Sequence, residues 1–192
     1  MLSYYQEITL ISDMNIPLSF LWTKVFTQLH IAFVDYTNTK GAMPFAVGFP
    51  EYDKKGLGVK LRIFSDSREN LERLQVGNWM SRLSDYIHVT SIRKVAVGRI
   101  NGYAVYSRFQ PDASVERKAR RYIRRHNDVT LKEAVALLKT KPQEGQFSYI
   151  QLKSASTGER FSLFIRQQLL ESPQMGNFNT YGLSATGSVP EF

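Results

Sequence analysis

The side chains best suited to acid–base chemistry near neutral pH are the three histidines, His30, His88 and His126. A free imidazole has a pKa of roughly 6.5, so it can take up or release a proton at cellular pH. His88 lies within an expected strand, and His126 ends a basic segment where it would meet the helix dipole favourably, so both are interpreted as structural. His30 follows Leu29 one turn after Phe26, at the edge of an apolar stripe. This spacing alone favours a partly buried core histidine over a catalytic base.

Several other chemistries are excluded by composition. The chain has no cysteine, which excludes disulfides, thiolate zinc sites and a cysteine nucleophile. The histidines are scattered, and the sequence has no compact carboxylate cluster of the kind that two-metal nucleases use. We therefore expect no metal and no small-molecule cofactor.

Positive charge is most concentrated in the segment SVERKARRYIRRH, Ser114 to His126, where six of 13 residues are Arg or Lys. At about 100° per residue, a helix places these cations within an arc of about 160°. Only Glu116 offers an acidic neighbour one turn away. Guanidinium groups suit phosphate oxygens, and the net charge of +8 also favours an acidic partner. The six cations are Arg117, Lys118, Arg120, Arg121, Arg124 and Arg125.

Two other interpretations of this basic helix remain open. Most charge runs are the solvated face of an ordinary amphipathic helix. A helix lying on a membrane surface would carry Phe, Leu or Trp opposite its cations, whereas this one carries small or polar-tipped residues there. Nucleic acid is therefore the favoured ligand. The residues opposite the cations are Val115, Ala119, Tyr122, Ile123 and His126.

The first half of the chain alternates predicted strands and helices. Aromatic and β-branched content predicts strands over 4–11, 44–49, 59–65 and about 86–97. Apolar spacing predicts an amphipathic helix over 17–36 and a second helix over 67–77, capped by Ser67 and ended by Gly77. The order strand, helix, strand, strand, helix, strand is the ferredoxin-like pattern, which many RNA-binding domains and many unrelated domains share.

The second half has a different pattern. Two short extended pieces are predicted around 102–110, followed by the basic helix and a short helix over 130–140 that Thr130 opens. Alternating segments at 146–153 and 160–167 predict a hairpin with serines at its tip, and the tail predicts loop with a short strand. We predict an α+β fold with an N-terminal ferredoxin-like (RRM-like) domain over 1–95. A C-terminal α+β domain over 96–192 would carry the arginine-rich helix.

The chain length of 192 residues suits one large domain or two small ones. No stretch approaches the roughly 18 to 20 consecutive apolar residues of a membrane helix. The first residues, MLSYYQEITLISD, lack the basic and apolar regions of a signal peptide. We expect a folded cytoplasmic protein with no membrane partner.

Four separated motifs carry a family resemblance. They are FTQLHIAFV with His30, YSRFQ before the helix that ends in RRH, KSASTGERFSLFIR, and YGLS followed by VPEF. In this order, across nearly the whole chain, they resemble the type I-F CRISPR repeat endoribonuclease, a family that makes CRISPR RNAs. Metal-free RNA cleavage needs a base for a ribose 2′-OH, a group that aligns this hydroxyl, and donors or cations for the developing charge.

The resemblance implies a reaction and its catalytic residues. It implies a ferredoxin-like domain followed by an arginine-rich-helix domain, and metal-free cleavage of the repeat RNA just 3′ of a stem-loop. The products would carry a cyclic phosphate and a 5′-hydroxyl. By position, His30 matches the catalytic histidine and Ser154 matches the serine that orients the attacking 2′-OH. Tyr181 matches a tyrosine near that site.

The resemblance also implies the RNA contacts and the partners. Arg108 and Gln110 match side chains that read bases at the foot of the stem, and Phe161 matches an aromatic that stacks on a nucleotide there. The expected partners are the CRISPR repeat RNA hairpin, the mature CRISPR RNA and other subunits of the type I-F surveillance complex. The full expected RNA-binding set is Arg108, Gln110, Arg117, Lys118, Arg120, Arg121, Arg124, Arg125, Ser156, Thr157 and Phe161.

Each assignment has an ordinary structural alternative. Ser154 suits a turn, and Tyr181 suits simple packing. Phe161 alternates in phase with Leu163 and Ile165, which by itself predicts a core position. Arg108 and Gln110 share a predicted strand face, which fits base readout but also any exposed strand. The rival functions are a non-catalytic protein that binds structured RNA, with His30 in the core, and a DNA-binding accessory factor.

Overall fold

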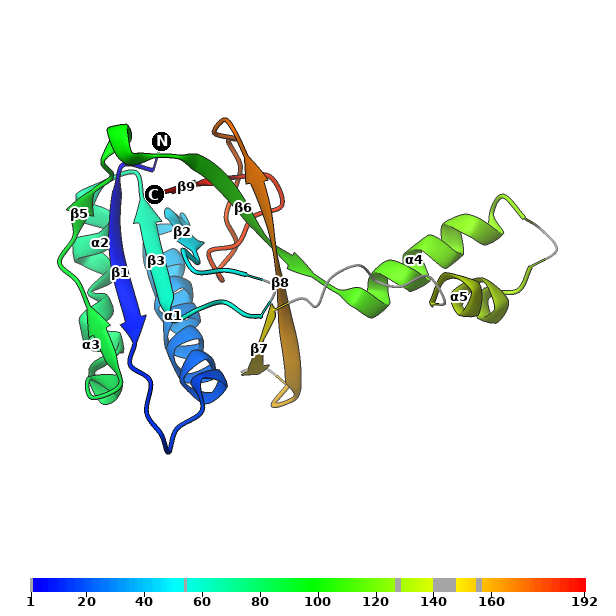
Figure 1. Cartoon of the computed structure of the whole chain (residues 1–192), viewed down its shortest axis with the longest axis horizontal. Helices are drawn as coiled ribbons and strands as arrows, with labels where there is room; N and C mark the ends of the chain where they lie inside the picture. The colour runs from blue at the N-terminus through cyan, green and yellow to red at the C-terminus, as the bar shows by residue number, and fades with distance from the viewer. Residues whose placement is uncertain (1, 54, 127–128, 140–147, 155–156) are drawn as a thin grey trace.

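The computed structural model describes residues 2–53, 55–126, 129–139, 148–154 and 157–192. It shows two antiparallel sheets with a long helix between them, and a pair of helices that projects as an arm from this body (Figure 1). The predicted α+β class is confirmed.

The first sheet is built from the first half of the chain and has the strand order β2-β3-β1-β4, with every neighbouring pair antiparallel. Apolar residues face each other in register, as Tyr5 with Phe64 and Ile8 with Leu61. The predicted order of elements is present. In chain order the elements are β1 (Tyr4–Leu10), α1 (Leu18–Lys40), β2 (Phe45–Gly48), β3 (Lys60–Ser65), α2 (Arg68–Leu74), α3 (Val76–Trp79), η1 (Ser81–Leu83), β4 (Ile87–Val89), β5 (Arg93–Lys94) and η2 (Val97–Arg99).

The end of α2 differs from the prediction. Ser67 caps the helix as expected, because its side chain accepts a hydrogen bond from the Asn70 backbone N–H at 3.2 Å. Gly77 does not end the helix. The chain turns at Gln75, in the left-handed conformation with φ 48°, and restarts as the short α3, in which Gly77 lies and Val76 is buried.

The single strand predicted over 86–97 is interrupted. Both pieces, β4 and β5, pair with β1, but the register of β5 is shifted by one residue relative to that of β4. An extra residue of this kind is typical of a bulge. Thr90 bridges the interruption, since its Oγ1 accepts a hydrogen bond from the Glu7 backbone N–H at 3.0 Å. A hydrogen bond from the β1 backbone to this side chain thus replaces part of the strand ladder.

The second sheet comes from the second half of the chain, with the order β7-β8-β6-β9. The predicted hairpin is present, and Ser154 follows directly after its first strand. The region 102–110 forms one long strand rather than the two short pieces predicted, because its residues pair continuously with β8. The strands are β6 (Gly102–Phe109), β7 (Ser148–Lys153), β8 (Arg160–Leu170) and β9 (Val189–Glu191).

Both sheets contribute to one buried cluster, with α1 at its centre. Figure 1 shows α1 between the sheets, where it contacts both β1 and β7. Because apolar side chains hold α1 from both sides, the position of His30 on this helix is fixed by the whole body. The buried residues of α1 are Leu21, Trp22, Val25, Phe26, Leu29, Ala32 and Phe33.

The arm consists of α4 (Pro111–Ile123) and α5 (Leu131–Lys139). The prediction placed the basic helix over 114–126, but it begins at Pro111, whose fixed φ suits the first helical position. It ends at Ile123, so Arg124 and Arg125 lie just beyond it. The predicted start of α5 is confirmed, since Thr130 and Glu133 bond to each other's backbone N–H groups at 2.9 and 3.4 Å.

Candidate functional site

His30 is half-buried on α1, and its ring is held by the loop that precedes β9. The Nδ1 atom lies 2.8 Å from the Thr180 carbonyl oxygen. Because a carbonyl can only accept, Nδ1 carries the proton and donates it there. In the neutral imidazole the lone pair is then on Nε2. His30 is therefore held in the tautomer that a general base requires.

Tyr181 fixes the orientation of the same ring. The His30 and Tyr181 rings stack with centroids 4.0 Å apart and planes 11° from parallel. Tyr181 also stacks on Phe26, with centroids 6.4 Å apart and planes 5° from parallel. The three rings form a column from the core to the surface, which limits rotation of the imidazole. The structure thus brings together His30 and Tyr181, which sequence reasoning had placed near one site.

The loop that carries Thr180 and Tyr181 is held by residues that sequence reasoning missed. The Asn179 side-chain oxygen accepts hydrogen bonds from the Tyr181 and Leu183 backbone N–H groups at 2.9 and 3.2 Å. Gly182 has φ 71°, and a Cβ there would lie 2.6 Å from Val47 Cγ1. An Asn followed three residues later by Gly was the available signal for a tight turn.

Ser154 lies at the end of β7, on a different element from His30. Its Oγ accepts a hydrogen bond from the Thr157 backbone N–H at 3.2 Å, and its backbone N–H donates to the Glu159 carbonyl at 2.8 Å. Ser154 therefore shapes the hairpin turn, which agrees with the structural alternative and does not test its proposed alignment of a 2′-OH. Thr157 is exposed, and Ser156 lies outside the described residues.

The predicted base-reading residues meet at the junction of body and arm. A hollow of about 330 Å³ opens there between the end of β6 and the middle of α4. Arg108 and Gln110 do not share a strand face as predicted, because Gln110 is the N-cap residue of α4. The fold brings them together all the same, with cations of the basic helix. The hollow is lined by Arg108, Phe109, Gln110, Arg117, Lys118 and Arg121.

Phe161 lies close to this junction, on β8. Its ring is half-buried, packs against the core, and has the Arg108 guanidinium carbon 5.8 Å from its centroid. The strand phase explains the packing, because Leu163 and Ile165 are fully buried on the same face. Part of the ring remains exposed beside Arg108.

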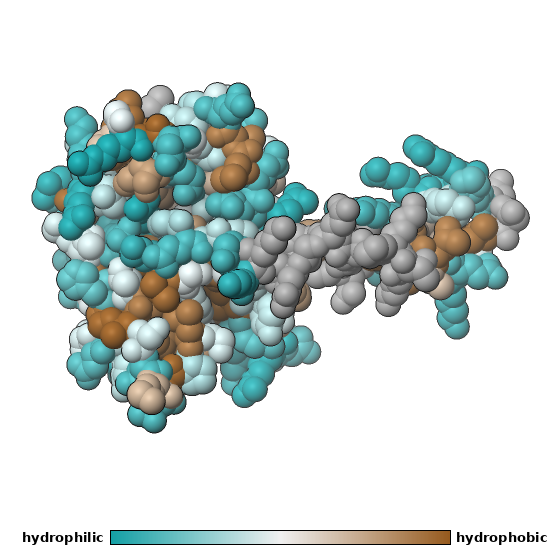
Figure 2. All heavy atoms as spheres, in the orientation of Figure 1, coloured by the Kyte–Doolittle hydropathy of each residue, from teal (hydrophilic) through white to brown (hydrophobic). Residues whose placement is uncertain are grey.

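The six cations of the basic segment are all exposed. Figure 2 shows hydrophilic side chains along the edges of the outer part of the arm, with apolar residues between them. Arg120 pairs with Glu116, with its Nη2 atom 2.6 Å from the carboxylate. Among the residues that the structure describes, it is the one arm cation with an ion pair. The like charges on this surface repel one another, which favours a polyanion as its ligand.

The other two histidines are placed differently from His30. His88 is exposed on β4, and His126 is exposed just past α4, where its ring stacks on Tyr122 with centroids 4.3 Å apart. Neither lies in a hollow described above. Among the described residues no group of three or more His, Cys, Asp or Glu is arranged to hold a metal ion.

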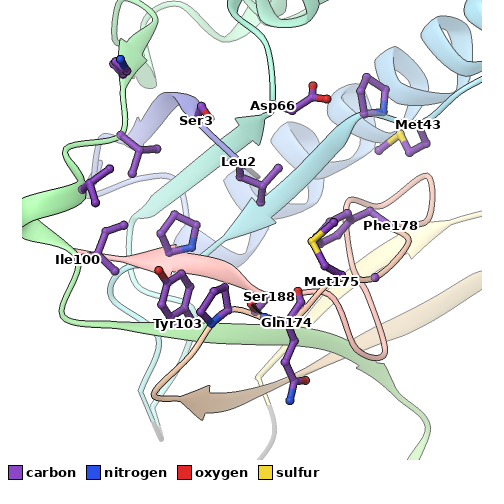
Figure 3. A pocket seen from close by; sticks show the side chains of 17 residues that line it. Leu2, Ser3, Met43, Asp66, Ile100, Tyr103, Gln174, Met175, Phe178 and Ser188 are labelled. Atoms are coloured by element: carbon purple, nitrogen blue, oxygen red, sulfur yellow. Dashed lines mark hydrogen bonds between the residues drawn. The ribbon is translucent and has the colours of Figure 1, made fainter.

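A more apolar hollow of about 370 Å³ opens at the far end of β6 (Figure 3). Tyr103 and Ile100 line one side, and Met175 and Phe178 line the other. No described residue of the predicted site lines it.

Among the described residues, no helix combines the length and apolarity needed to cross a membrane.

Comparison with known proteins gives full-length matches. The family model described as CRISPR-associated protein (Cas_Csy4) matches residues 5–192. A relative from Escherichia coli (strain UTI89 / UPEC) named CRISPR-associated endonuclease Cas6/Csy4 is 30% identical over 193 residues, covering 100% of both chains. A relative of the same name from Pseudomonas aeruginosa (strain UCBPP-PA14) is 33% identical over 195 residues, again covering 100% of both. The similarity spans both sheets and the arm.

Proposed function

The chain belongs to the Cas_Csy4 family of CRISPR-associated proteins, and from this membership we propose that it is an endoribonuclease that processes CRISPR repeat RNA. The family match supports the class of enzyme. The observation that carries the proposal is the His30 ring, fixed by the Thr180 carbonyl and the Tyr181 ring with its Nε2 lone pair available. A polycationic arm on the same chain supports RNA as the ligand.

In the proposed reaction, His30 Nε2 takes the proton of a ribose 2′-OH at the cleavage position. The 2′-oxygen bonds to the neighbouring phosphorus as the bond from phosphorus to the 5′-oxygen breaks. The 5′-oxygen takes up a proton from water and His30 releases its proton to water, so the products carry a 2′,3′-cyclic phosphate and a 5′-hydroxyl. Ser154 aligns the 2′-OH, and nearby positive charge stabilises the phosphorane. No metal takes part.

The arm and its junction with the body hold the RNA in this proposal. The major groove of A-form RNA is too deep and narrow for side-chain reading, so the basic helix holds phosphates and shape. Arg108 and Gln110 read bases at the foot of the stem, and Phe161 stacks on a nucleotide there. In this division, the part over 1–95 supplies the general base His30, and the part over 96–192 supplies most of the RNA contacts. Cleavage falls just 3′ of the stem.

We further propose that the protein keeps its mature CRISPR RNA and joins a type I-F surveillance complex with other subunits. The exposed, largely unpaired cations support slow release of a product that still contains the stem.

One experiment tests the reaction. The protein is mixed in EDTA with a labelled hairpin repeat RNA and with a copy that carries a single 2′-deoxy nucleotide before the cut. We expect cleavage of the first RNA and tight binding without cleavage of the second. Cleavage of the deoxy RNA would refute attack by the 2′-OH.

A second candidate, a non-catalytic protein that binds structured RNA, is favoured by the half-buried state of His30 and its packing against Tyr181. In that case the histidine only supports the loop before β9. Tight binding of both RNAs without cleavage of either would establish this alternative.

A further inference from the structure

A large hollow on the body lies apart from the basic arm. It has a volume of about 880 Å³ and opens between the start of α1, the loop that contains Glu51 and Asp53, and the strand β7. Pockets of roughly 300 to 1,000 Å³ are typical of ligand sites. Two of its aromatic side chains are well exposed, with Phe20 50% and Tyr149 56% accessible to solvent. Exposed rings at the wall of a hollow are suited to stacking on a flat ligand.

The strand β7 also brings polar residues to this hollow. Ser148, at the start of β7, lines the hollow and is only 9% exposed. Within the described part of the chain, its Oγ is the buried side-chain polar atom that has no hydrogen-bond partner. This Oγ is shielded from solvent and lies in phase with the buried Ile150 and Leu152, so it is on the core side of β7. Gln151, also in the lining, adds an amide whose oxygen accepts the Ser162 hydroxyl at 2.8 Å.

The charges at the rim favour a neutral, flat ligand group over a phosphate. The Glu51 carboxylate is held by Lys60 at 3.1 Å and by the Val59 backbone N–H at 2.9 Å. One oxygen of Asp53 accepts two backbone N–H groups of its own loop. With Lys55 as the one cation beside these two carboxylates among the described lining residues, the hollow has no net positive charge to attract a phosphate. A base fits this chemistry, with its phosphates outside near cations such as Lys24, which lies 5.0 Å from the Phe20 ring centroid.

The hollow is continuous with the elements that carry the proposed cleavage site. Thr23 lines it, and His30 follows seven residues later on the same helix, about 10 Å away along the axis. At 100° per residue, Phe20, Thr23 and His30 lie on one side of α1. The other wall, β7, leads directly to Ser154. The stem would occupy the arm and the Arg108 junction, which share no lining residue with this hollow.

We propose that this hollow is a second RNA-binding site, which holds an unpaired nucleotide just 3′ of the cleavage position by stacking its base on Phe20 or Tyr149. Gln151, which lies on the same face of β7 as Tyr149, supplies a hydrogen bond to the edge of the base. The inference rests on the proposed function, because it takes the scissile phosphate to lie at His30. It adds recognition of the strand that leaves after cleavage.

The test compares two non-cleavable hairpin RNAs, each with the 2′-deoxy nucleotide before the cut. One ends at the cut and the other continues for a few unpaired nucleotides. We expect the extension to tighten binding roughly tenfold, the size typical of base stacking on an aromatic ring. Phe20→Ala or Tyr149→Ala, whichever removes the ring that stacks on the base, should abolish most of this gain, and both should leave binding of the short RNA unchanged. Leu169→Ala is the matched control, because Leu169 is 70% exposed on β8 and lies outside the hollow.

Gln151→Ala tests the proposed contact with the edge of the base. It removes the amide that lies on the same strand face as Tyr149, so the gain from the extension should fall while binding of the short RNA stays unchanged. The proposal is overturned if the extension gives no gain, or if the gain survives in all three hollow variants, as it would if an apolar peptide or a second copy occupied the hollow. Cleavage of the unmodified hairpin in EDTA is measured in parallel. Cleavage without an extension gain would refute this inference alone, and a gain that depends on Tyr149 without cleavage would refute only the proposed reaction.

Discussion

The body and the arm of this protein use their residues in opposite ways. In the body, aromatic rings pack on one another around α1, and the polar groups of the candidate site are bonded to the backbone, as His30 is to Thr180. In the arm, small residues such as Ala119 and Ala134 are buried, and the long cations are exposed. The body therefore fixes geometry, which proton transfer needs, and the arm presents charge, which a phosphate backbone can meet in many arrangements.

The largest difference between variants of the body and of the arm should appear in the rate of RNA cleavage. His30→Ala removes the proposed base, so single-turnover cleavage should fall by roughly 10²- to 10⁴-fold. Binding of the non-cleavable hairpin should stay within about twofold, since the phosphate contacts lie elsewhere. His126→Ala is the matched control on the arm and should cleave normally. A His30→Ala protein that cleaves at the wild-type rate would contradict the assignment.

Folding stability should also depend far more on the body than on the arm. Phe33 is fully buried and stacks on Phe45 with centroids 5.0 Å apart. Phe33→Ala should lower the free energy of unfolding by about 3–5 kcal/mol. Val115→Ala, at a buried position of α4, removes two carbons and should lower it by only about 1–2 kcal/mol. Equal losses in urea unfolding would contradict the comparison.

The precision of the body can be tested at the loop before β9. Gly182 and Gly41 both have positive φ, 71° and 72°, but a Cβ at Gly182 would meet Val47, whereas none of the structure lies within 4 Å of one at Gly41. Both Ala variants carry backbone strain of roughly 1 kcal/mol. Gly182→Ala should in addition displace Thr180 and Tyr181 and slow cleavage at least tenfold. If Gly41→Ala slowed cleavage equally, displacement of the loop would not be the cause.

The arm should respond through salt dependence. Arg121 lines the hollow at the junction and is exposed. Arg121→Ala should reduce the slope of log affinity against log salt concentration by about one unit. Arg82→Ala, which removes an exposed cation of the body, is the control and should leave the slope unchanged. Binding measured across a salt series decides between them, and an unchanged slope in Arg121→Ala would remove this residue from the interface.

The smallest expected effect is on the pH dependence of folding stability, and it involves the body alone. Burial raises the pKa of the Glu191 carboxyl, and the Tyr106 hydroxyl and Arg62 only partly offset this. The folded state thus holds the Glu191 carboxyl proton more tightly than the unfolded state does. As pH rises from the ordinary glutamate pKa through the raised value, the free energy of unfolding therefore falls. Glu191→Gln should therefore increase stability at neutral pH and flatten the dependence over that window. Urea unfolding at acidic and neutral pH measures it, and a loss of stability at neutral pH would contradict it.

The Tyr106 hydroxyl connects Glu191 to the backbone of Phe49 and to Gln167 on β8. Its oxygen lies 2.9 Å from both the Phe49 carbonyl and a Glu191 carboxyl oxygen, and it also accepts a hydrogen bond from Gln167. One hydroxyl proton can serve only one acceptor. Donation to Glu191 stabilises the carboxylate, which is why this hydroxyl lowers the Glu191 pKa against the larger effect of burial.

Local sequence determined most of the elements of this protein and many of their ends. The spacing of Leu21, Val25 and Leu29 on α1, and the caps at Ser67 and Thr130, act over one or two turns, so they can be read from the chain. The family and its candidate residues were likewise carried by short motifs. The bulge after β4 and the turn at Gln75 could not be predicted, because each depends on what the neighbouring strand or helix presents.

The site itself was decided by tertiary structure. The sequence favoured a core histidine at position 30, and only folding brings the Thr180 carbonyl, 150 residues away, to the Nδ1 atom. Arg108 and Gln110 meet Arg121 because β6 runs straight into α4, which the two predicted short pieces did not suggest. Periodicity specifies which side of an element is buried, since that depends on neighbouring residues. It does not specify which distant backbone group a side chain meets there, since that depends on how the two sheets pack around α1.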